Sequence, residues 1–132
     1  MHHELTLQGF ECDKMMGGKD MDWADRDQVM RRFRRGDQHI LLATDLVSWG
    51  IDIPGLKVVI NFDVPFEKDE DGFFKASKET YLHRIGRTGR FDTKGIAINL
   101  IKGGASAKQE LKYLEEIKTE YGSEITELKS AE

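Results

Sequence analysis

The chain has 132 residues, of which 39% are hydrophobic and 33% are charged. This length and balance indicate one globular domain with a core, not a disordered chain, and no apolar run approaches the roughly 20 residues of a membrane helix. The single cysteine, Cys12, excludes an intramolecular disulfide and a cysteine-based zinc site, and it fits a reducing compartment. The net charge of −4 disfavours a general, charge-driven nucleic-acid binder, so any polyanion site must be local.

Alternating apolar runs and amphipathic stretches predict the elements in chain order. Helices are predicted at 2–9 (the end of a helix), 24–35, 78–87 and 105–121, with a helical turn at 46–49. Strands are predicted at 11–16, 39–43, 57–62 and 95–101, a polar surface loop at 66–79, and a tail at about 123–132. Buried strands that alternate with helices indicate an α/β fold, a parallel sheet with helices on both faces. In such a sheet the ligand site lies at the carboxyl ends of the strands.

Positive charge gathers in two segments of this acidic chain. Residues 26–36 hold five arginines against one aspartate, and residues 81–94 hold three arginines and one lysine against one aspartate. Such islands can capture phosphate groups without making the whole surface cationic. The alternative for the first island is a solvated helix face.

The segment HRIGRTGR, residues 83–90, is the most specific pattern in the chain. At helical spacing, Arg84 and Arg87 lie within one turn of each other, and Arg90 follows closely. Their guanidinium groups would repel one another unless an anion or paired carboxylates neutralised them. Because the planar guanidinium binds phosphate oxygens in pairs, the pattern favours arginines that face a nucleotide phosphate. The alternative is an exposed basic helix.

This segment resembles motif VI of the DEAD-box RNA helicases, and three further segments agree with that family in order and spacing. Residues 41–54 resemble motif V, residues 58–65 resemble the strand and turn that follow it, and residues 29–36 resemble the helix that precedes it. Together the resemblance spans roughly residues 5–122. The long insertion between Pro65 and Tyr81 is most similar to the mRNA-export branch at the nuclear pore.

The resemblance implies that residues 1–132 form the second, C-terminal RecA-like domain of a helicase, closing on a first domain of the same protein. ATP with Mg²⁺ would lie between the two domains, and the metal ligands would belong to the first domain. Neither a GxxxxGK[ST] phosphate loop nor a D-E-A-D sequence occurs here, so this chain alone is expected to be inactive. The implied ATP-binding residues are Gly50, Asp52, Arg87 and Arg90, of which Asp52 holds the ribose and the two arginines are the catalytic arginine fingers.

The same resemblance implies an RNA partner. Thr44 and Arg26 match residues that contact RNA phosphates, and His83 matches a residue that contacts the first domain. Contacts of this kind position a strand without reading its bases. The expected setting is intracellular, in the cytoplasm or nucleus and including the nuclear pore, with export or translation adaptor proteins as partners and no membrane.

The sequence departs from the family's motifs at two positions, which leaves an alternative function open. Trp49 replaces the motif V arginine, and Trp23 stands at the glutamine position of the QxxR motif. The alternative function, favoured by Trp49 and by the missing first strand of the family's sheet, is a diverged, non-catalytic RecA-like module that binds RNA or a protein. In addition, the chain is expected to be truncated, because it begins within the helix that follows the motif IV strand. Since that strand is interior to the family's sheet, its loss would expose strand edges and permit self-association through the truncated sheet.

Overall fold

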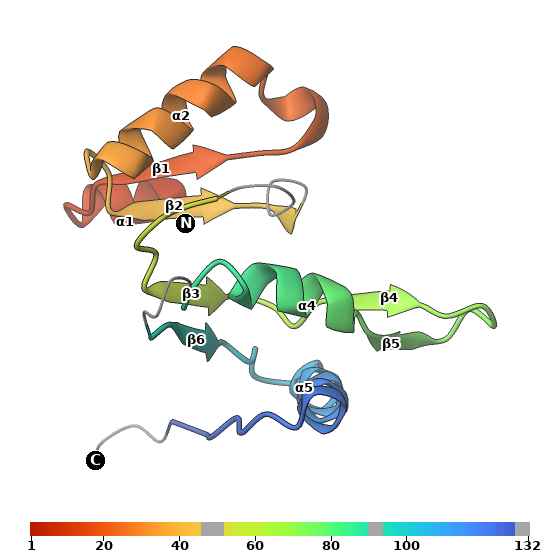
Figure 1. Cartoon of the computed structure of the whole chain (residues 1–132). Coiled ribbons are helices and arrows are strands. Elements are labelled where there is room, and N and C mark those ends of the chain that lie inside the picture. The colour runs from red at the N-terminus through yellow and green to blue at the C-terminus, as the bar shows by residue number, and fades with distance from the viewer. Residues whose placement is uncertain (46–51, 90–93, 129–132) are drawn as a thin grey trace.

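The computed structural model describes residues 1–45, 52–89 and 94–128 (Figure 1). Its helices are α1 (His2–Leu7), a short 3₁₀ helix (Gly18–Asp20), α2 (Trp23–Arg35), α4 (Lys78–Ile85) and α5 (Ala107–Tyr121). Its strands are β1 (Cys12–Met15), β2 (Ile40–Ala43), β3 (Val58–Asn61), β4 (Phe66–Lys68), β5 (Phe74–Ala76) and β6 (Ile96–Asn99). The helices and strands predicted outside residues 66–79 are confirmed, and the helical turn predicted at 46–49 lies outside the described residues.

Helix α2 shows how local sequence defines an element. Its N-cap, Asp22, accepts a hydrogen bond from the backbone N–H of Asp25 at 2.8 Å, which satisfies one of the donors left open in the first turn. The helix ends at Gly36, whose φ of 79° lies in the left-handed region that glycine adopts without strain. Val29 and Met30 are buried on its inner face.

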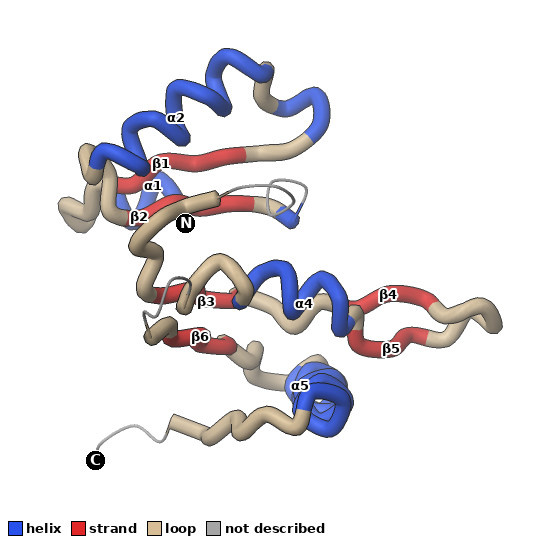
Figure 2. Tube along the Cα trace, in the orientation of Figure 1, coloured by secondary structure: helices blue, strands red, loops and turns tan. Residues whose placement is uncertain are grey.

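The parallel sheet has two halves. β1 pairs with β2 and β3 pairs with β6, both in parallel. Figure 2 shows the strands in the order β1, β2, β3, β6, and among the described residues no backbone ladder joins β2 to β3. The prediction of a parallel sheet is therefore confirmed, and the edges of β2 and β3 face each other without a described ladder; that a strand is missing between them stays a prediction.

The prediction of a surface loop at 66–79 is wrong, because β4 and β5 form an antiparallel hairpin there. Asp69 closes its turn by accepting hydrogen bonds from the backbone N–H groups of Asp71 (3.1 Å) and Phe73 (2.8 Å). The ring of Phe66 stacks on Tyr113 of α5, with centroids 5.8 Å apart. A sequence this polar can form a hairpin because its turn is closed by side-chain hydrogen bonds and one face packs on a helix.

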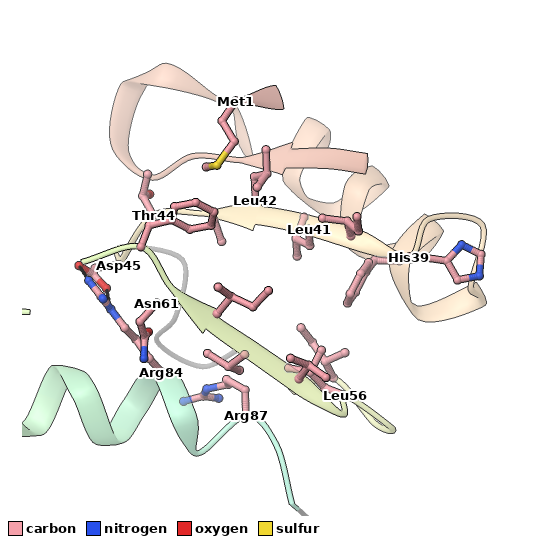
Figure 3. A pocket seen from close by; sticks show the side chains of 18 of the residues that line it. Met1, His39, Leu41, Leu42, Thr44, Asp45, Leu56, Asn61, Arg84 and Arg87 are labelled. Carbon is pink, nitrogen blue, oxygen red and sulfur yellow. Dashed lines mark hydrogen bonds and ion pairs between the residues drawn. The ribbon is translucent and has the colours of Figure 1, made fainter. Parts of the chain in front are cut away.

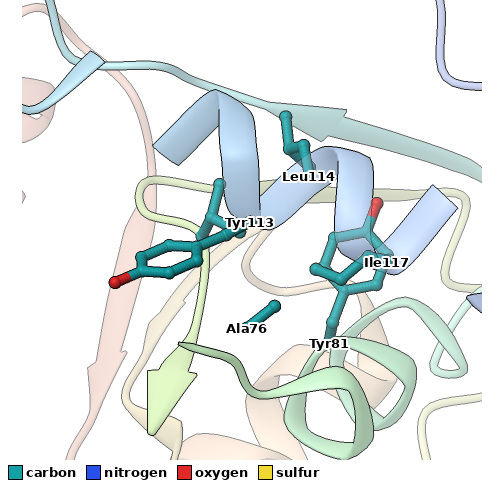
Figure 4. Packing of buried hydrophobic residues seen from close by; sticks show 6 residues of the cluster. Ala76, Tyr81, Tyr113, Leu114 and Ile117 are labelled. Atoms are coloured by element: carbon teal, nitrogen blue, oxygen red, sulfur yellow. The ribbon is translucent and has the colours of Figure 1, made fainter. Parts of the chain in front are cut away.

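Among the described residues the core consists of two separate clusters, one for each half of the sheet. The first contains Met15, Val29 and Met30. The second gathers hairpin and helix residues around α5, as Figure 4 shows, and consists of Val64, Ala76, Tyr81, Tyr113, Leu114 and Ile117. Leu111, on the same helix, is 55% exposed and lies outside this cluster. No helix in the described part of the chain has the length and apolarity needed to cross a bilayer.

Candidate functional site

β2, β3 and the end of α4 surround one cavity (Figure 3). The cavity has a volume of about 580 Å³, and its walls are mostly the apolar side chains of the two facing strands, such as Leu41 and Ile60. Thr44 and Arg84 lie at its polar end, and Arg87 lines it further along β3, towards Leu56. The fold thus places two residues of the predicted motifs at the carboxyl ends of the strands, where parallel sheets hold their ligands, and a third on the wall of the same cavity.

Arg84 is the most constrained of these side chains, with 15% of its side chain exposed. Its Nε and Nη2 donate to the two carboxylate oxygens of Asp45 at 2.5 and 2.7 Å. Its Nη1 donates to the backbone carbonyl and the Oδ1 of Asp63 at 2.9 and 3.0 Å, and Nη2 also reaches that Oδ1. Burial would lower the pKa of Arg84, but the hydrogen bonds and charges of Asp45 and Asp63 outweigh it and raise the pKa above its ordinary value.

Arg87 lies in the turn that follows α4, and it is half-buried. Its Nε donates to the backbone carbonyl of His83 at 3.0 Å, which holds the base of the guanidinium against the end of the helix. His83 is half-buried on the last turn of α4. Arg90 and Gly50, which were predicted to share the nucleotide site with Arg87, lie outside the described residues.

Asp52 is exposed, and its backbone is held by a residue that sequence reasoning missed. Arg34, near the end of α2, donates from Nε and Nη2 to the carbonyl oxygen of Asp52 at 3.2 and 3.0 Å. The excess of arginine in residues 26–36 indicated that this helix could bind acidic groups. Nothing in the sequence pattern, however, connects residue 34 with residue 52.

The two candidate RNA ligands, Thr44 and Arg26, are anchored on neighbouring residues of one loop. The hydroxyl of Thr44 accepts a hydrogen bond from the backbone N–H of Gly17 at 3.2 Å. The guanidinium of Arg26 donates to the carbonyl of Gly18, and its buried Nε has no hydrogen-bond partner among the described residues. Because the Thr44 hydroxyl acts there as an acceptor, its own hydrogen remains available for donation. Residues far apart in sequence thus come together as two donors at one edge.

The remaining candidates from the sequence are the two tryptophans and a metal site, and none of them lines this cavity among the described residues. Trp23, at the first turn of α2, is 78% exposed and is therefore not packed beneath a loop. Trp49 lies outside the described residues. Within residues 1–45, 52–89 and 94–128, no three metal-ligating side chains cluster.

Comparison with known proteins places the chain in a family. The model of the helicase conserved C-terminal domain matches residues 1–92. Over 125 residues the chain is 39% identical to an ATP-dependent RNA helicase eIF4A of Pyricularia oryzae and 40% identical to a eukaryotic initiation factor 4A of Cryptosporidium parvum. In both cases the match takes in 95% of this chain but 27% of the relative, so the chain spans about a quarter of the length of these curated relatives.

Solved structures agree with this assignment. The C-terminal domain of the DEAD-box protein Dbp5 superposes with a TM-score of 0.76 at 35% identity, over 92% of this chain and 62% of that one. S. cerevisiae Dbp5 bound to RNA and ADP BeF3 gives 0.75 at 34% identity, over 92% of this chain and 28% of that one. The E. coli DEAD-box protein SrmB, bound to regulator of ribonuclease activity A, gives 0.69 at 34% identity, over 89% and 59%. The chain therefore belongs to the helicase conserved C-terminal domain family, as a C-terminal domain of the DEAD-box type.

Proposed function

We propose that this chain is the second RecA-like domain of an ATP-dependent RNA helicase, and that it completes both an ATP site and an RNA site when it closes on a first domain. One observation carries the proposal. The candidate RNA ligands Thr44 and Arg26 are anchored beside the carboxyl ends of β2 and β1, the candidate arginine finger Arg87 lines the cavity between β2 and β3, and Arg84 connects the two groups through Asp45. Hydroxyl and guanidinium donors bind phosphate oxygens, so one group suits the RNA backbone and the other suits the phosphates of ATP.

The nucleotide half consists of donors that fit ATP. The guanidinium groups of Arg87 and Arg90 would hold the γ-phosphate and stabilise the charge that builds up on it during transfer. The carboxylate of Asp52 would hold the ribose, and Gly50 is a further residue predicted for this ATP site. ATP bound with Mg²⁺ supplies the phosphoryl group, and the metal ligands would come from the first domain.

The proposed RNA site, formed by Thr44 and Arg26, binds the phosphate backbone. Thr44 would donate its hydroxyl hydrogen to a phosphate oxygen, and Arg26 would add a positive charge nearby. Because these contacts avoid base edges, they would bind single-stranded RNA of any sequence. Both the ATP and the RNA sites are completed by closure, so each ligand would strengthen the binding of the other. His83 would contact the first domain in that closed state.

An active-site substitution tests this proposal. The chain is joined to the first RecA-like domain of an eIF4A relative, and RNA-stimulated ATP turnover is measured. Arg87→Ala and Arg90→Ala are each expected to lower turnover by about 10³-fold or more, the usual contribution of an arginine finger. The matched control is Arg31→Ala, which removes a guanidinium paired with Asp27 on the exposed face of α2. Unchanged turnover in the two finger variants would refute the enzymatic role.

A second function is favoured by Trp49, which stands where the family's motif V arginine is expected. A tryptophan cannot bring that positive charge to the cleft, so a non-catalytic RecA-like module that binds RNA or a protein is the alternative. The same fusion protein distinguishes the two, because RNA binding without stimulated turnover indicates the module.

The setting of the protein is also a proposal. The curated relatives are named as initiation factors or eIF4A helicases, and S. cerevisiae Dbp5 has been solved with Gle1 and Nup159. These names support an intracellular protein, cytoplasmic or nuclear, with translation or export adaptors as partners. The nuclear-pore branch rests on the insertion between Pro65 and Tyr81, and localisation of the tagged protein at the nuclear rim would test it.

A further inference from the structure

Side chains hold together two half-sheets that no described backbone ladder connects. β1 and β2 form one half, β3 and β6 form the other, and each half has its own core cluster. The hydrogen bonds of Arg84 to Asp45 cross the gap between the two halves, whereas Arg34 holds the carbonyl of Asp52 on the first half, where the neighbouring Ile53 packs against the first core cluster. Arg84 stands on α4, which packs on β3, whereas Asp45 is the second residue after the end of β2. This ion pair therefore ties the second half to the first.

The bonding of Arg84 leaves it poorly suited to bind a phosphate itself. Nε, Nη1 and Nη2 each donate to Asp45 or Asp63, and the fork is filled on both sides by carboxylates. An incoming phosphate would be repelled by those same carboxylates. The sequence left open whether an anion or paired carboxylates neutralise the arginines of residues 83–90, and for Arg84 the answer is the carboxylates.

The place of the Arg84–Asp45 pair matters for function. Asp45 follows Thr44, the candidate RNA ligand, and Arg84 precedes Arg87, the candidate finger, by one helical turn. A displacement at the end of β2 therefore reaches the end of α4 through one bidentate ion pair. A bidentate fork fixes orientation as well as distance, which a point charge such as lysine would not do.

We propose that Arg84 is a positioning residue that, through its ion pair with Asp45, fixes the position of the RNA contact at Thr44 relative to the nucleotide contact at Arg87. This inference rests on the proposed function for its catalytic consequence, though not for the geometry. Asp63 lies on the same half as α4 and therefore serves as an internal control. It holds the same guanidinium without crossing the gap.

The geometry is tested on the 132-residue chain by amide hydrogen exchange. Asp45→Asn is expected to raise exchange by about tenfold or more in residues 82–88 and beside Thr44, because both ends of the link are released. Asp63→Asn is expected to change exchange beside Thr44 by less than about twofold. A third variant, Arg32→Gln, removes a bidentate pair with Asp13 within the first half, and its effect should stay in α2 and β1. Unchanged exchange in Asp45→Asn would overturn the proposal.

The functional consequence is tested by a double-mutant cycle in the fusion protein. Arg84→Lys, which keeps the charge but loses the fork, is expected to lower both turnover at saturating ATP and the factor by which RNA stimulates it. In an Arg87→Ala background the same change should have less than about a twofold further effect, since Arg84 acts through Arg87. Fully additive losses would overturn the positioning role. If Arg87→Ala alone leaves turnover unchanged, the proposed function fails, and the exchange experiment still decides the geometry.

Discussion

Neighbouring arginines in this chain have different surroundings, and those surroundings suggest different roles. Arg84 is held by the carboxylates of Asp45 and Asp63, whereas the Nε of Arg87 donates to the backbone carbonyl of His83. Folding raises the pKa of Arg84, so its charged guanidinium stabilises the fold fully at every pH below the ordinary arginine pKa. Arg84 loses that stabilisation only as the pH rises through the raised pKa. Its ion pairs are therefore insensitive to titration of the arginine near neutral pH.

The two RNA ligands give a prediction at the residue scale. In the fusion protein, Arg26→Gln should weaken RNA binding equally for different sequences and reduce the salt dependence by about one unit of log–log slope, because one phosphate contact is lost. Thr44→Val should weaken binding without changing that slope, since the hydroxyl is neutral. Fluorescence anisotropy at several salt concentrations measures both. Arg35→Gln, on an exposed residue at the far end of α2, is the control. A change in sequence preference would contradict the backbone contact.

At the scale of the elements, α5 supports the C-terminal half of the domain. It packs on the β4–β5 hairpin and on α4. The side chain of Ile117 is fully buried in this cluster, while Leu111 on the same helix is 55% exposed. The carboxylate of Glu116 also accepts a hydrogen bond from the backbone N–H of Ala76 at 2.9 Å. The hairpin is therefore fastened to α5 by apolar packing and by a side-chain hydrogen bond.

This arrangement predicts unequal costs for two aliphatic truncations in α5. Ile117→Ala should lower the free energy of unfolding by about 2–5 kcal/mol, because it leaves a cavity among buried side chains. Leu111→Ala should change that free energy by about 0.5 kcal/mol or less, since its side chain already contacts water. Urea denaturation followed by circular dichroism measures both. Equal losses in the two variants would contradict the packing described for α5.

At the scale of the whole molecule, the chain consists of two packed halves around an apolar cavity. The facing edges of β2 and β3 leave backbone groups unpaired among the described residues, and Val58 and Ile60 on β3 are 43% and 49% exposed. Open edges flanked by apolar side chains favour pairing with another chain. We expect the 132-residue chain to be less stable than a closed sheet of this size, and prone to associate.

Self-association is therefore the prediction for the isolated chain. Its weight-average mass in sedimentation equilibrium should rise with concentration, and Ile60→Lys should suppress that rise by placing a charge at the open edge. Leu111→Lys, which introduces the same charge at an exposed leucine of α5, should leave the association unchanged. A compact monomer at all concentrations, confirmed by solution scattering, would show that the gap does not recruit a second copy.

Local sequence determined much of this protein. Apolar runs and amphipathic periods specified most helices and strands, because burial and helix capping act over a few residues, as at Asp22 and Gly36. The resemblance to the DEAD-box motifs identified Thr44, Asp52 and Arg87 as candidates. Their roles stay predictions, as do those of Arg90 and Gly50, which lie outside the described residues.

Only the tertiary structure decided which of these residues meet. Arg84 joins residues 39 and 21 positions away, and Arg34 reaches a carbonyl 18 positions away. The β4–β5 hairpin likewise depends on Tyr113, far along the chain in α5. Contacts at such separations leave no periodic signal in the sequence, because they are set by how whole elements pack. The pairing of an arginine with carboxylates at Asp45 and Asp63 became visible only once the strand ends and α4 were brought together.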